Sequence, residues 1–279
     1  MKPVFFTIFA LTAFAFNSIL CRLALGTNAI DAASFTSVRL ISGTAVLLII
    51  VLFSGSYKKN EKGHPGNWYS AFFLFAYAAC FSFAYNGLTT ATGALILFGS
   101  VQLTMFAVSI IRGEKPGIFE WIGLVAAFAG LVYLVLPGLE SPPIISSILM
   151  AIAGAAWGFY TLLGKGTDNP INDTFGNFCR SLPFALIVAA SFFLEARFTW
   201  FGFWMAVISG AVASGIGYAV WYAALRYHSS ARAAVLQLSV PLIAAAGGVI
   251  IVAEPISSRL PVAAVLILGG ILATIAVRK

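Results

Sequence analysis

Charged residues are scarce in this chain, and their scarcity excludes a soluble globular domain. Only 9% of the 279 residues are Asp, Glu, Lys or Arg, whereas about 25% is usual in soluble domains. Hydrophobic residues make up 61% of the sequence, and the mean hydropathy is +0.98. A chain of this composition is expected to fold within a lipid bilayer and to cross it several times.

Cysteine and histidine are also few, which argues against metal centres and membrane-embedded enzymes. Cys21, Cys80 and Cys179 lie within or near apolar segments without a CxxC spacing, so we expect packing residues rather than disulfides or metal ligands. His64 and His228 fall in predicted connections between spans. A catalytic site needs a nucleophile with a base, or a metal cluster, on facing helices. The sequence therefore predicts no enzymatic activity, no cofactor and no bound metal.

Long apolar runs fill most of the chain. A helix needs about 20 residues to cross about 30 Å of hydrocarbon. We expect ten such runs, at residues 3–25, 33–53, 68–87, 91–111, 117–137, 144–164, 173–194, 200–222, 231–253 and 260–277. The first run is too long for a cleavable signal peptide and lacks a small-residue cleavage pattern. The predicted fold class is an all-α polytopic membrane protein with ten transmembrane helices.

The chain repeats itself. In each half a Tyr and a Leu lead through an apolar run to Glu and Pro, and then to small residues. The markers are Tyr85, Leu88, Glu114, Pro116 and Gly130 in one half, and Tyr222, Leu225, Glu254, Pro255 and Gly270 in the other. Residues 1–138 and 144–279 are thus predicted to be two five-helix repeats of one bundle. Five spans per copy invert one half relative to the other, a plan typical of secondary transporters with a substrate near the midplane.

The net charge of +7 predicts orientation in the membrane rather than binding to nucleic acid. If the amino terminus is cytoplasmic, only Arg22, Arg39, Arg197 and Arg259 of the sixteen Lys and Arg residues fall outside. Short cytoplasmic loops are biased toward Lys and Arg. Both termini are therefore predicted to be cytoplasmic, with the basic loops beside anionic lipid.

An aromatic residue followed eight positions later by a cation occurs in the first span of each repeat. Phe14 precedes Arg22, and Trp157 precedes Lys165. Eight residues are about 12 Å of helix and slightly more than two turns, so the ring and the cation lie roughly on one side. The following span carries an arginine at a similar place in each copy, Arg39 and Arg180.

Together with Ala156-Trp157-Gly158 and Glu254-Pro255, these motifs resemble the drug/metabolite transporter superfamily, and within it the EamA-type ten-helix exporters. The first half departs from the pattern, with Phe14-Ala15 and Glu114-Lys115-Pro116. In length and in segments such as residues 34–39, the chain is most similar to the bacterial aromatic amino-acid exporters of the YddG type. The resemblance implies a multi-pass protein of the bacterial inner (cytoplasmic) membrane.

All nine acidic residues fall at the ends of predicted spans or in loops. Proton-coupled pumps commonly use a carboxylate deep in the membrane, where burial makes its protonation responsive. We therefore expect passive, gradient-driven alternating access. The same distribution disfavours a pump for cationic drugs, and the lack of a central Lys or Arg disfavours a carrier of phosphorylated sugars.

Neutral polar and aromatic side chains within the spans are the remaining candidates for recognition. The predicted cavity residues are Asn17, Tyr85, Gln102, Trp157, Tyr160, Tyr218, Trp221 and Gln237. Amides and hydroxyls can bind a zwitterion while rings enclose an apolar side chain, which suits bulky neutral amino acids. The alternative for aromatic residues near span ends is an interfacial belt. The alternative for the amides is a hydrogen bond to a neighbouring helix.

Six charged residues are candidate gates or ion pairs: Arg22, Asp31, Arg39, Lys165, Asp173 and Arg180. Arg39 lies about 10 Å from the end of its span, so we expect it to snorkel and to pair with Asp31. Arg180 or Lys165 is expected to pair with Asp168 or Asp173. Such pairs either stabilise the fold or act as gates, one per repeat, that open alternately.

Two prolines are predicted hinges. Pro183 and Pro241 fall inside the seventh and ninth spans, where each would remove a hydrogen bond from the helix. The leading hypothesis is an exporter of aromatic or bulky neutral amino acids that works by rocking of the bundle halves. The alternatives are broader efflux of amphipathic metabolites or drugs and, in another class, a non-transporting membrane scaffold. The sequence leaves the oligomeric state open.

Overall fold

The computed structural model of the protein describes residues 2–54, 66–113, 117–136, 141–164, 169–225, 227 and 236–276. Within these ranges the secondary structure is helical, apart from turns and one isolated bridge between Ile30 and Phe198. Six helices are long and apolar enough to cross a membrane, and shorter apolar helices accompany them. The prediction of an all-helical polytopic membrane protein is confirmed at this level.

The described part of the first half contains α1 (Lys2–Gly26), α2 (Ala32–Phe53), α3 (Trp68–Ala84), α4 (Thr90–Ile111) and α5 (Ile118–Val135). Short polar side chains begin α2, α3 and α4. Asp31, Asn67 and Thr89 each accept a hydrogen bond from the backbone amide three residues ahead. These amides have no acceptor inside the helix, so the caps fix where each helix begins.

The second half begins with α6 (Ile144–Gly164), α7 (Pro170–Ser191) and a short 3-10 helix, η2 (Phe193–Glu195). A continuous rod follows, made of α8 (Trp200–Ile208), the π-helix η3 (Ser209–Ile216) and α9 (Gly217–Leu225). The last helices are α11 (Ser239–Val252) and α12 (Arg259–Ala276). A π-helical stretch is rare and frequently marks a functional site, and η3 lies in the middle of its rod.

The structure treats the two predicted hinge prolines differently. Pro183 lies inside α7, as predicted. Pro241 is the third residue of α11, which begins at Ser239. The first amides of a helix have no intrahelical acceptor, so proline at this position removes no hydrogen bond. A turn at Leu238 separates α11 from the helical residues 236–237, and the role of Pro241 as a hinge stays a prediction.

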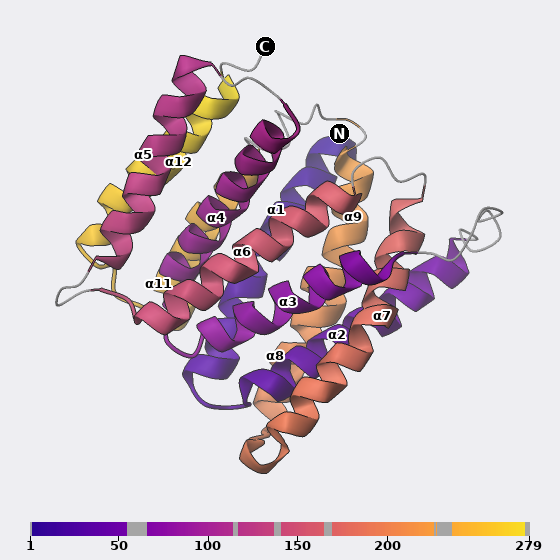
Figure 1. Ribbon diagram of the computed structural model, residues 1–279. Coiled ribbons are helices and arrows are strands. Elements are labelled where there is room, and N and C mark those ends of the chain that lie inside the picture. Colours follow the sequence, from indigo (N-terminus) through magenta and orange to yellow (C-terminus); the bar gives the residue numbers. More distant parts are fainter. Residues whose placement is uncertain are drawn as a thin grey trace.

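Helix contacts in one half have counterparts in the other. α3 packs on α6 and α7, and the rod of α8, η3 and α9 packs on α1 and α2. Likewise α4 packs on α6, and α11 packs on α1. The remaining principal contacts join helices at the same place in each half, which are α2 with α7, α4 with α11 and α5 with α12. Figure 1 shows α5 and α12 side by side at one flank of the bundle.

The glycines that mark the sequence repeat lie in close contacts between α5 and α12. A Cβ atom on Gly270 would lie 2.5 Å from the carbonyl oxygen of Gly123, and one on Gly130 would lie 2.8 Å from Ile267. A Cβ on the neighbouring Gly269 would meet nothing within 4 Å. Small residues permit such close helix packing in membranes, which explains one pair of the repeat markers.

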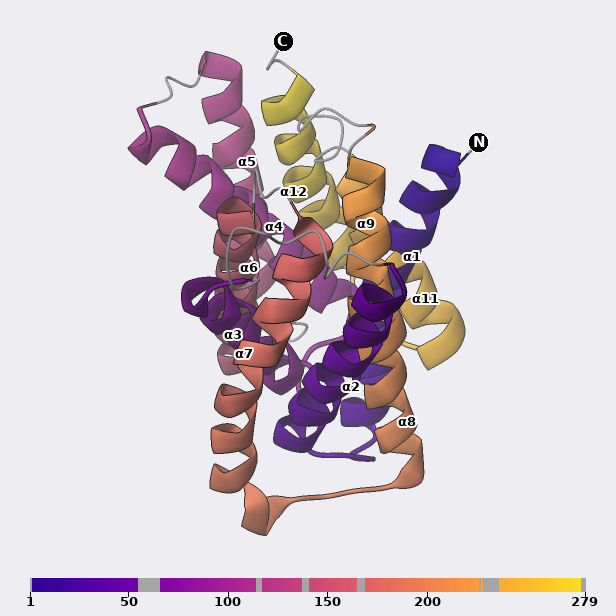
Figure 2. The same ribbon diagram turned by 90° about the vertical axis from the view of Figure 1, so that its right-hand side faces the viewer.

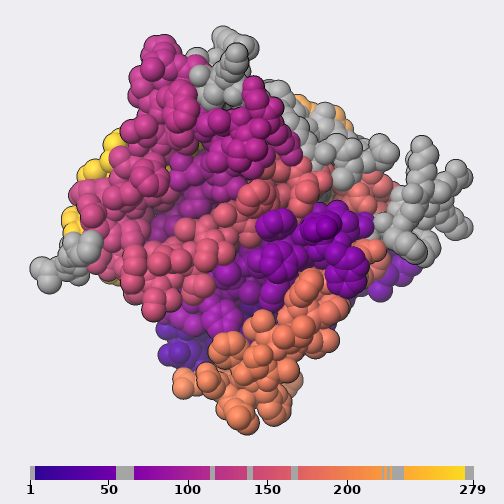
Figure 3. Space-filling view, viewed as in Figure 1, coloured from indigo at the N-terminus to yellow at the C-terminus, as the bar shows by residue number. Residues whose placement is uncertain are grey.

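Apolar side chains cover the outside of the bundle, and polar side chains gather inside it. Ile111, Ile250 and Val265 are among many exposed hydrophobic residues, whereas Asn17 and Arg39 are buried. The face in Figure 3 is closely packed where α3, α6 and α7 lie side by side. This distribution fits a bundle surrounded by lipid, in which polar groups are satisfied internally.

The two ends of the bundle are named here by what lies at them. Figures 1 and 2 show the amino and carboxyl termini at the same end, which we call the terminal end. It also holds the start of α3 at Trp68 and the start of α7 at Pro170. The distal end holds the end of α1 at Gly26, the start of α4 at Thr90 and the link from α7 to α8.

Candidate functional site

A small cavity lies in the centre of the bundle. Its walls come from α1, α3, α4, α6 and α9, and the lining residues are Phe14, Asn17, Tyr77, Phe81, Leu97, Phe98, Trp157 and Tyr218. The space available to the centre of a water-sized sphere is about 20 Å³. One water needs about 10 to 15 Å³ by this measure, so the cavity as it stands is too small for an organic solute.

Aromatic rings from four helices meet around this cavity. Trp157 lies 4.9 Å from Tyr77 and 5.0 Å from Tyr218 between ring centroids. Phe14 contacts Tyr218 at 5.7 Å and Trp221 at 5.8 Å. These separations are those of ordinary aromatic pairs. A wall of rings on separate helices can part to admit a flat apolar group and close behind it.

The amide of Asn17 is bound to the π-helix η3. Asn17 Oδ1 accepts a hydrogen bond from the Ser209 hydroxyl, and Asn17 Nδ2 donates to Ser214 Oγ at 3.5 Å. A Cβ on Gly210 would lie 2.0 Å from the carbonyl oxygen of Arg39, so only glycine allows η3 to pack so closely on α2. The π-helix thus brings two serine hydroxyls to the inner side of the bundle.

Arg39 is almost completely buried beside this network, with a relative exposure of 1%. Its Nε donates to Ser214 Oγ at 3.2 Å, and its Nη2 donates to the Tyr77 hydroxyl at 3.0 Å. Its guanidinium carbon lies 5.2 Å from the ring centre of Tyr77 and 5.1 Å from that of Phe81, within the range of cation–π attraction.

This position corrects the expectation that Arg39 snorkels and pairs with Asp31. The carboxylate of Asp31 instead caps α2 at Ser34 N and accepts from Arg197 N at 3.0 Å. Arg39 faces inward because α2 packs against α3 and η3 at this level. The position of Arg39 along α2 was predicted correctly, but neighbouring helices cover its side chain. The bundle therefore has a central arginine, contrary to the expectation of none.

An ion pair joins several segments at the distal end. Arg22 Nε lies 2.7 Å from Glu254 Oε1, and Arg22 Nη1 donates to the carbonyl oxygen of Tyr85 at 3.3 Å. The other carboxylate oxygen of Glu254 accepts from Thr90 N at 2.8 Å, at the start of α4, where a helix favours negative charge. This contact ties α1, the end of α3, the start of α4 and the segment after α11.

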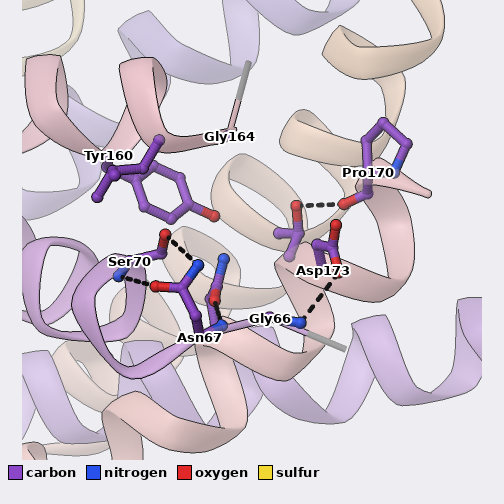
Figure 4. A pocket seen from close by; sticks show the side chains of 10 residues that line it. Gly66, Asn67, Ser70, Tyr160, Gly164, Pro170 and Asp173 are labelled. Carbon is purple, nitrogen blue, oxygen red and sulfur yellow. Dashed lines mark hydrogen bonds between the residues drawn. The ribbon is translucent and has the colours of Figure 1, made fainter. Parts of the chain in front are cut away.

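A larger pocket opens at the terminal end, between the beginnings of α3 and α7 and the end of α6. About 120 Å³ is available there to the centre of a water-sized sphere. Gly66 N donates to Asp173 Oδ1 at 3.0 Å, and Asn67 N donates to Asn177 Oδ1 at 2.9 Å. Figure 4 shows Tyr160 reaching into the same space from α6.

Two neighbouring rings of α6 line the terminal pocket and the central cavity, one ring each. Tyr160 lines the pocket and Trp157 lines the cavity. They are neighbours on α6, with ring centroids 5.5 Å apart. The ring contact between Tyr160 and Trp157 thus brings a wall of the pocket next to a wall of the cavity.

The predicted cavity residues therefore divide into groups. Asn17, Trp157 and Tyr218 line the central cavity, and Trp221 contacts its ring wall. Trp221 is buried, as is Tyr85, whose hydroxyl donates to the carbonyl oxygen of Thr90. The interfacial-belt alternative is therefore wrong for these two residues. Gln102 and Gln237 are half-buried on α4 and just before α11, and they do not line either cavity.

The remaining predicted charges also have defined places. Asp173 lines the terminal pocket. Arg180 Nη1 donates to the carbonyl oxygen of Gly176 on its own helix at 3.2 Å. Lys165 and Asp168 lie outside the described residues.

Sequence reasoning missed Tyr77, Phe81, Ser214 and Glu254 as parts of the site. Tyr77 and Phe81 are four residues apart on α3 and so share one face of the helix. That spacing was visible, but many of the 25 phenylalanines share similar patterns. Glu254 carried a clearer signal, because it was already a marker of the repeat.

Comparison of the chain with known proteins found a matching family profile, two similar sequences and a similar structure. The sequence profile of the EamA-like transporter family matches residues 1–136 and again residues 144–276. An uncharacterized protein of Pseudomonas aeruginosa, PA1977, is 43% identical over 99% of this chain and 96% of its own length. A protein of Bacillus subtilis named uncharacterized transporter YoaV is 20% identical over 89% of each chain. A crystal structure superposes with a TM-score of 0.68, over 99% of this chain and 98% of the other, at 18% identity, and supports the fold alone.

Proposed function

The chain belongs to the EamA-like transporter family, and from this premise we propose that it exports aromatic or bulky neutral amino acids. It is a multi-pass membrane protein by family and by its apolar helices. In the proposal it resides in the bacterial inner membrane with the terminal end in the cytoplasm. Substrate enters from that end, occupies the central cavity and leaves at the distal end.

The observation that carries the proposal is the ring wall of the central cavity. Phe14, Trp157 and Tyr218 come from α1, α6 and α9, far apart in the chain, and meet at one point in the bundle. Small-molecule sites are typically apolar and aromatic, with a few polar groups that fix orientation. Here Asn17 and the hydroxyls of Tyr77 and Tyr218 supply those groups. The resemblance to aromatic amino-acid exporters points to the same substrates.

The proposed architecture is a ten-helix bundle made of two inverted repeats of five helices. The two separate profile matches support two repeats of similar length. The paired helix contacts support an approximate two-fold relation between the halves. The contact of α3 with α6 corresponds to the contact of the α8–α9 rod with α1, in which the two halves have changed places. In transporters of this plan the substrate lies between the repeats near the midplane, and the lining of the central cavity by both halves of the chain supports such a site.

The proposed transport cycle is alternating access without a proton-relay carboxylate. The small cavity and the ion pair at the distal end support a state closed toward that end. The pocket at the terminal end supports access from the other side. Arg22 and Glu254 serve as the distal gate, while Asp173 belongs to the terminal end, which must open and close in turn.

Flux measured in proteoliposomes tests this function. Labelled phenylalanine on one side of the membrane should exchange with unlabelled phenylalanine on the other, and a panel of amino acids should compete according to ring size. Trp157→Ala removes a ring from the cavity and should reduce exchange about twofold to tenfold, since an aromatic contact contributes about 0.5 to 1.5 kcal/mol.

The matched control is Trp204→Ala, because Trp204 is an exposed residue on α8. This variant should retain the exchange of the parent protein. Absence of flux for every amino acid would refute the proposal. Flux of many unrelated amphipathic compounds, with no preference for amino acids, would support the broader efflux function instead.

A further inference from the structure

The guanidinium of Arg39 uses only part of its hydrogen-bonding capacity. Nε and Nη2 donate to Ser214 and Tyr77. Nη1 is buried and has no hydrogen-bond partner among the described residues. Buried polar groups are normally paired, and each exception calls for an explanation such as a bound ligand or water.

The charge of Arg39 also lacks a neighbouring carboxylate. Arg39 forms no ion pair with any of the described residues, whereas Arg22 pairs with Glu254 at the distal end. The rings of Tyr77 and Phe81 attract the cation, and two hydroxyls accept its hydrogen bonds, but all of these groups are neutral. A buried charge is costly unless it is paired, and charged residues in the membrane usually mark a ligand pathway.

The cavity in front of Arg39 offers donors. Tyr77 accepts from Arg39, and a hydroxyl that accepts can also donate its own hydrogen to an acceptor. The Tyr218 hydroxyl is buried and has no hydrogen-bond partner in the described residues. Both tyrosines line the cavity. The one amide in the wall, Asn17, is already bound to Ser209 and Ser214.

We propose that Arg39, with the hydroxyls of Tyr77 and Tyr218, forms a carboxylate site, and that the protein recognises its substrate as an aromatic monocarboxylate. The α-amino group is then dispensable, because none of the residues that line the cavity is acidic. This inference rests on the proposed function and refines its substrate class. Arg39 lies behind Tyr77 and Phe81 in the closed cavity, so its Nη1 meets the carboxylate when the ring wall parts.

A single guanidinium favours a monoanion. A doubly charged phosphate ester would leave one negative charge without a partner in a site that has excluded water. An aromatic amine would place a cation near Arg39 with no carboxylate to receive it. Among ligands with the same ring, the proposed site should therefore bind a carboxylate more tightly than a phosphate ester or an amine.

Competition in the phenylalanine exchange assay tests this ranking on the full-length protein. The competitors are 3-phenylpropanoate, which lacks the amino group, phenethylamine, which lacks the carboxylate, and phenyl phosphate. We expect 3-phenylpropanoate to compete within about threefold of phenylalanine. Phenethylamine should be about tenfold to a hundredfold weaker, as expected for loss of a charge-assisted hydrogen bond. Phenyl phosphate should also compete weakly.

Two variants separate the carboxylate site from general effects. Tyr218→Phe keeps the ring and removes the hydroxyl, so it should weaken competition by 3-phenylpropanoate while leaving phenethylamine unchanged. Arg39→Lys keeps the charge but loses the planar fork, and it should weaken every carboxylate about tenfold. Arg197→Gln, an exposed arginine in the link between α7 and α8, should behave as the parent. Gel filtration and thermal unfolding establish that each variant is folded.

The outcomes distinguish the two proposals. Lack of phenylalanine exchange in the parent protein overturns the proposed function. Normal exchange with phenethylamine competing as well as 3-phenylpropanoate overturns the carboxylate site alone. Stronger competition by phenyl phosphate would also overturn it, by indicating a phosphate carrier. If Arg39→Lys does not fold, the ranking of competitors on the parent protein and on Tyr218→Phe still decides the question.

Discussion

The two ends of the bundle are closed by different chemistry. At the distal end an ion pair of 2.7 Å between Arg22 and Glu254 is reinforced by two backbone groups. At the terminal end Asp173 and Asn177 accept hydrogen bonds from the backbone amides of Gly66 and Asn67, around a pocket of about 120 Å³. One end is sealed by opposite charges, whereas the other keeps a polar hollow that leads toward the cavity.

This difference indicates which end of the bundle is harder to open. The distal contact joins two side chains of opposite charge, whereas at the terminal end the Asp173 carboxylate accepts from a neutral backbone amide, which gives less Coulomb attraction. The distal contact therefore holds the bundle closed on that side, and opening it requires a gain elsewhere, such as substrate bound in the cavity. At the terminal end Tyr160, which lines the pocket, lies in ring contact with Trp157, which lines the cavity.

The largest expected effect follows from breaking the distal closure. Glu254→Gln keeps an acceptor for Thr90 N but removes the charge that binds Arg22, and should weaken closure by about 1 to 3 kcal/mol. Cys21 is fully buried next to Arg22, so its labelling by a membrane-impermeant maleimide reports opening. With Cys80 and Cys179 replaced by Ser, labelling from the distal side should rise about tenfold.

The control for this prediction exchanges the charges. Arg22→Glu combined with Glu254→Arg restores an ion pair of opposite direction and should recover part of the protection of Cys21. A Cys21→Ser variant should give no signal. Equal labelling of the parent and of Glu254→Gln would show that the ion pair does not hold the distal end closed.

The next prediction concerns the packing of α5 on α12, which belongs to the framework that both ends share. Gly270→Ala places a methyl group 2.5 Å from the carbonyl oxygen of Gly123, so α5 and α12 must move apart. Overpacking of this kind costs about 1 to 3 kcal/mol, which should lower the midpoint of thermal unfolding in detergent. Gly269→Ala is the matched control because nothing lies within 4 Å of its Cβ. Equal unfolding temperatures for the two variants would contradict the close approach of α5 and α12.

The smallest effect is expected at the terminal end. Asp173→Ala removes the acceptor for Gly66 N and a negative charge from the first turn of α7. The loss should be about 1 kcal/mol in the free energy of unfolding, with little change in the labelling of Cys21. Asp173→Asn keeps an acceptor and should lie between this variant and the parent. A large rise in Cys21 labelling would show that the two ends are not independent.

Helix positions could be predicted from the sequence because long apolar runs leave few alternatives. α2 and α4 begin within one residue of the predicted spans, since Asp31 and Thr89 provide caps. Asn17, Trp157 and Tyr218 were also found in advance as intramembrane polar or aromatic residues. These predictions needed only depth along a helix.

The remaining parts of the site depend on which side of a helix faces which neighbour. Arg39 lies at the expected position along α2, but α3 and η3 bury its side chain. Because α2 is almost uniformly apolar, no periodicity in its sequence reveals which side of the helix faces these neighbours. Ser214 becomes a partner through the π-helical turn of η3, which changes the register of the rod. Glu254 pairs with Arg22 although they are 232 residues apart, a contact that only the tertiary fold brings about.

Accessibility of the central cavity from each side of the membrane tests the account most directly. Leu97 lines the cavity on α4, so Leu97→Cys in a protein without its three native cysteines places one thiol there. The account predicts that an impermeant maleimide reaches this thiol from the terminal end and that phenylalanine protects it. It also predicts that the distal side reaches it only after Glu254→Gln. Equal labelling of the parent from both sides, or no protection by phenylalanine, would contradict a substrate cavity closed at the distal end.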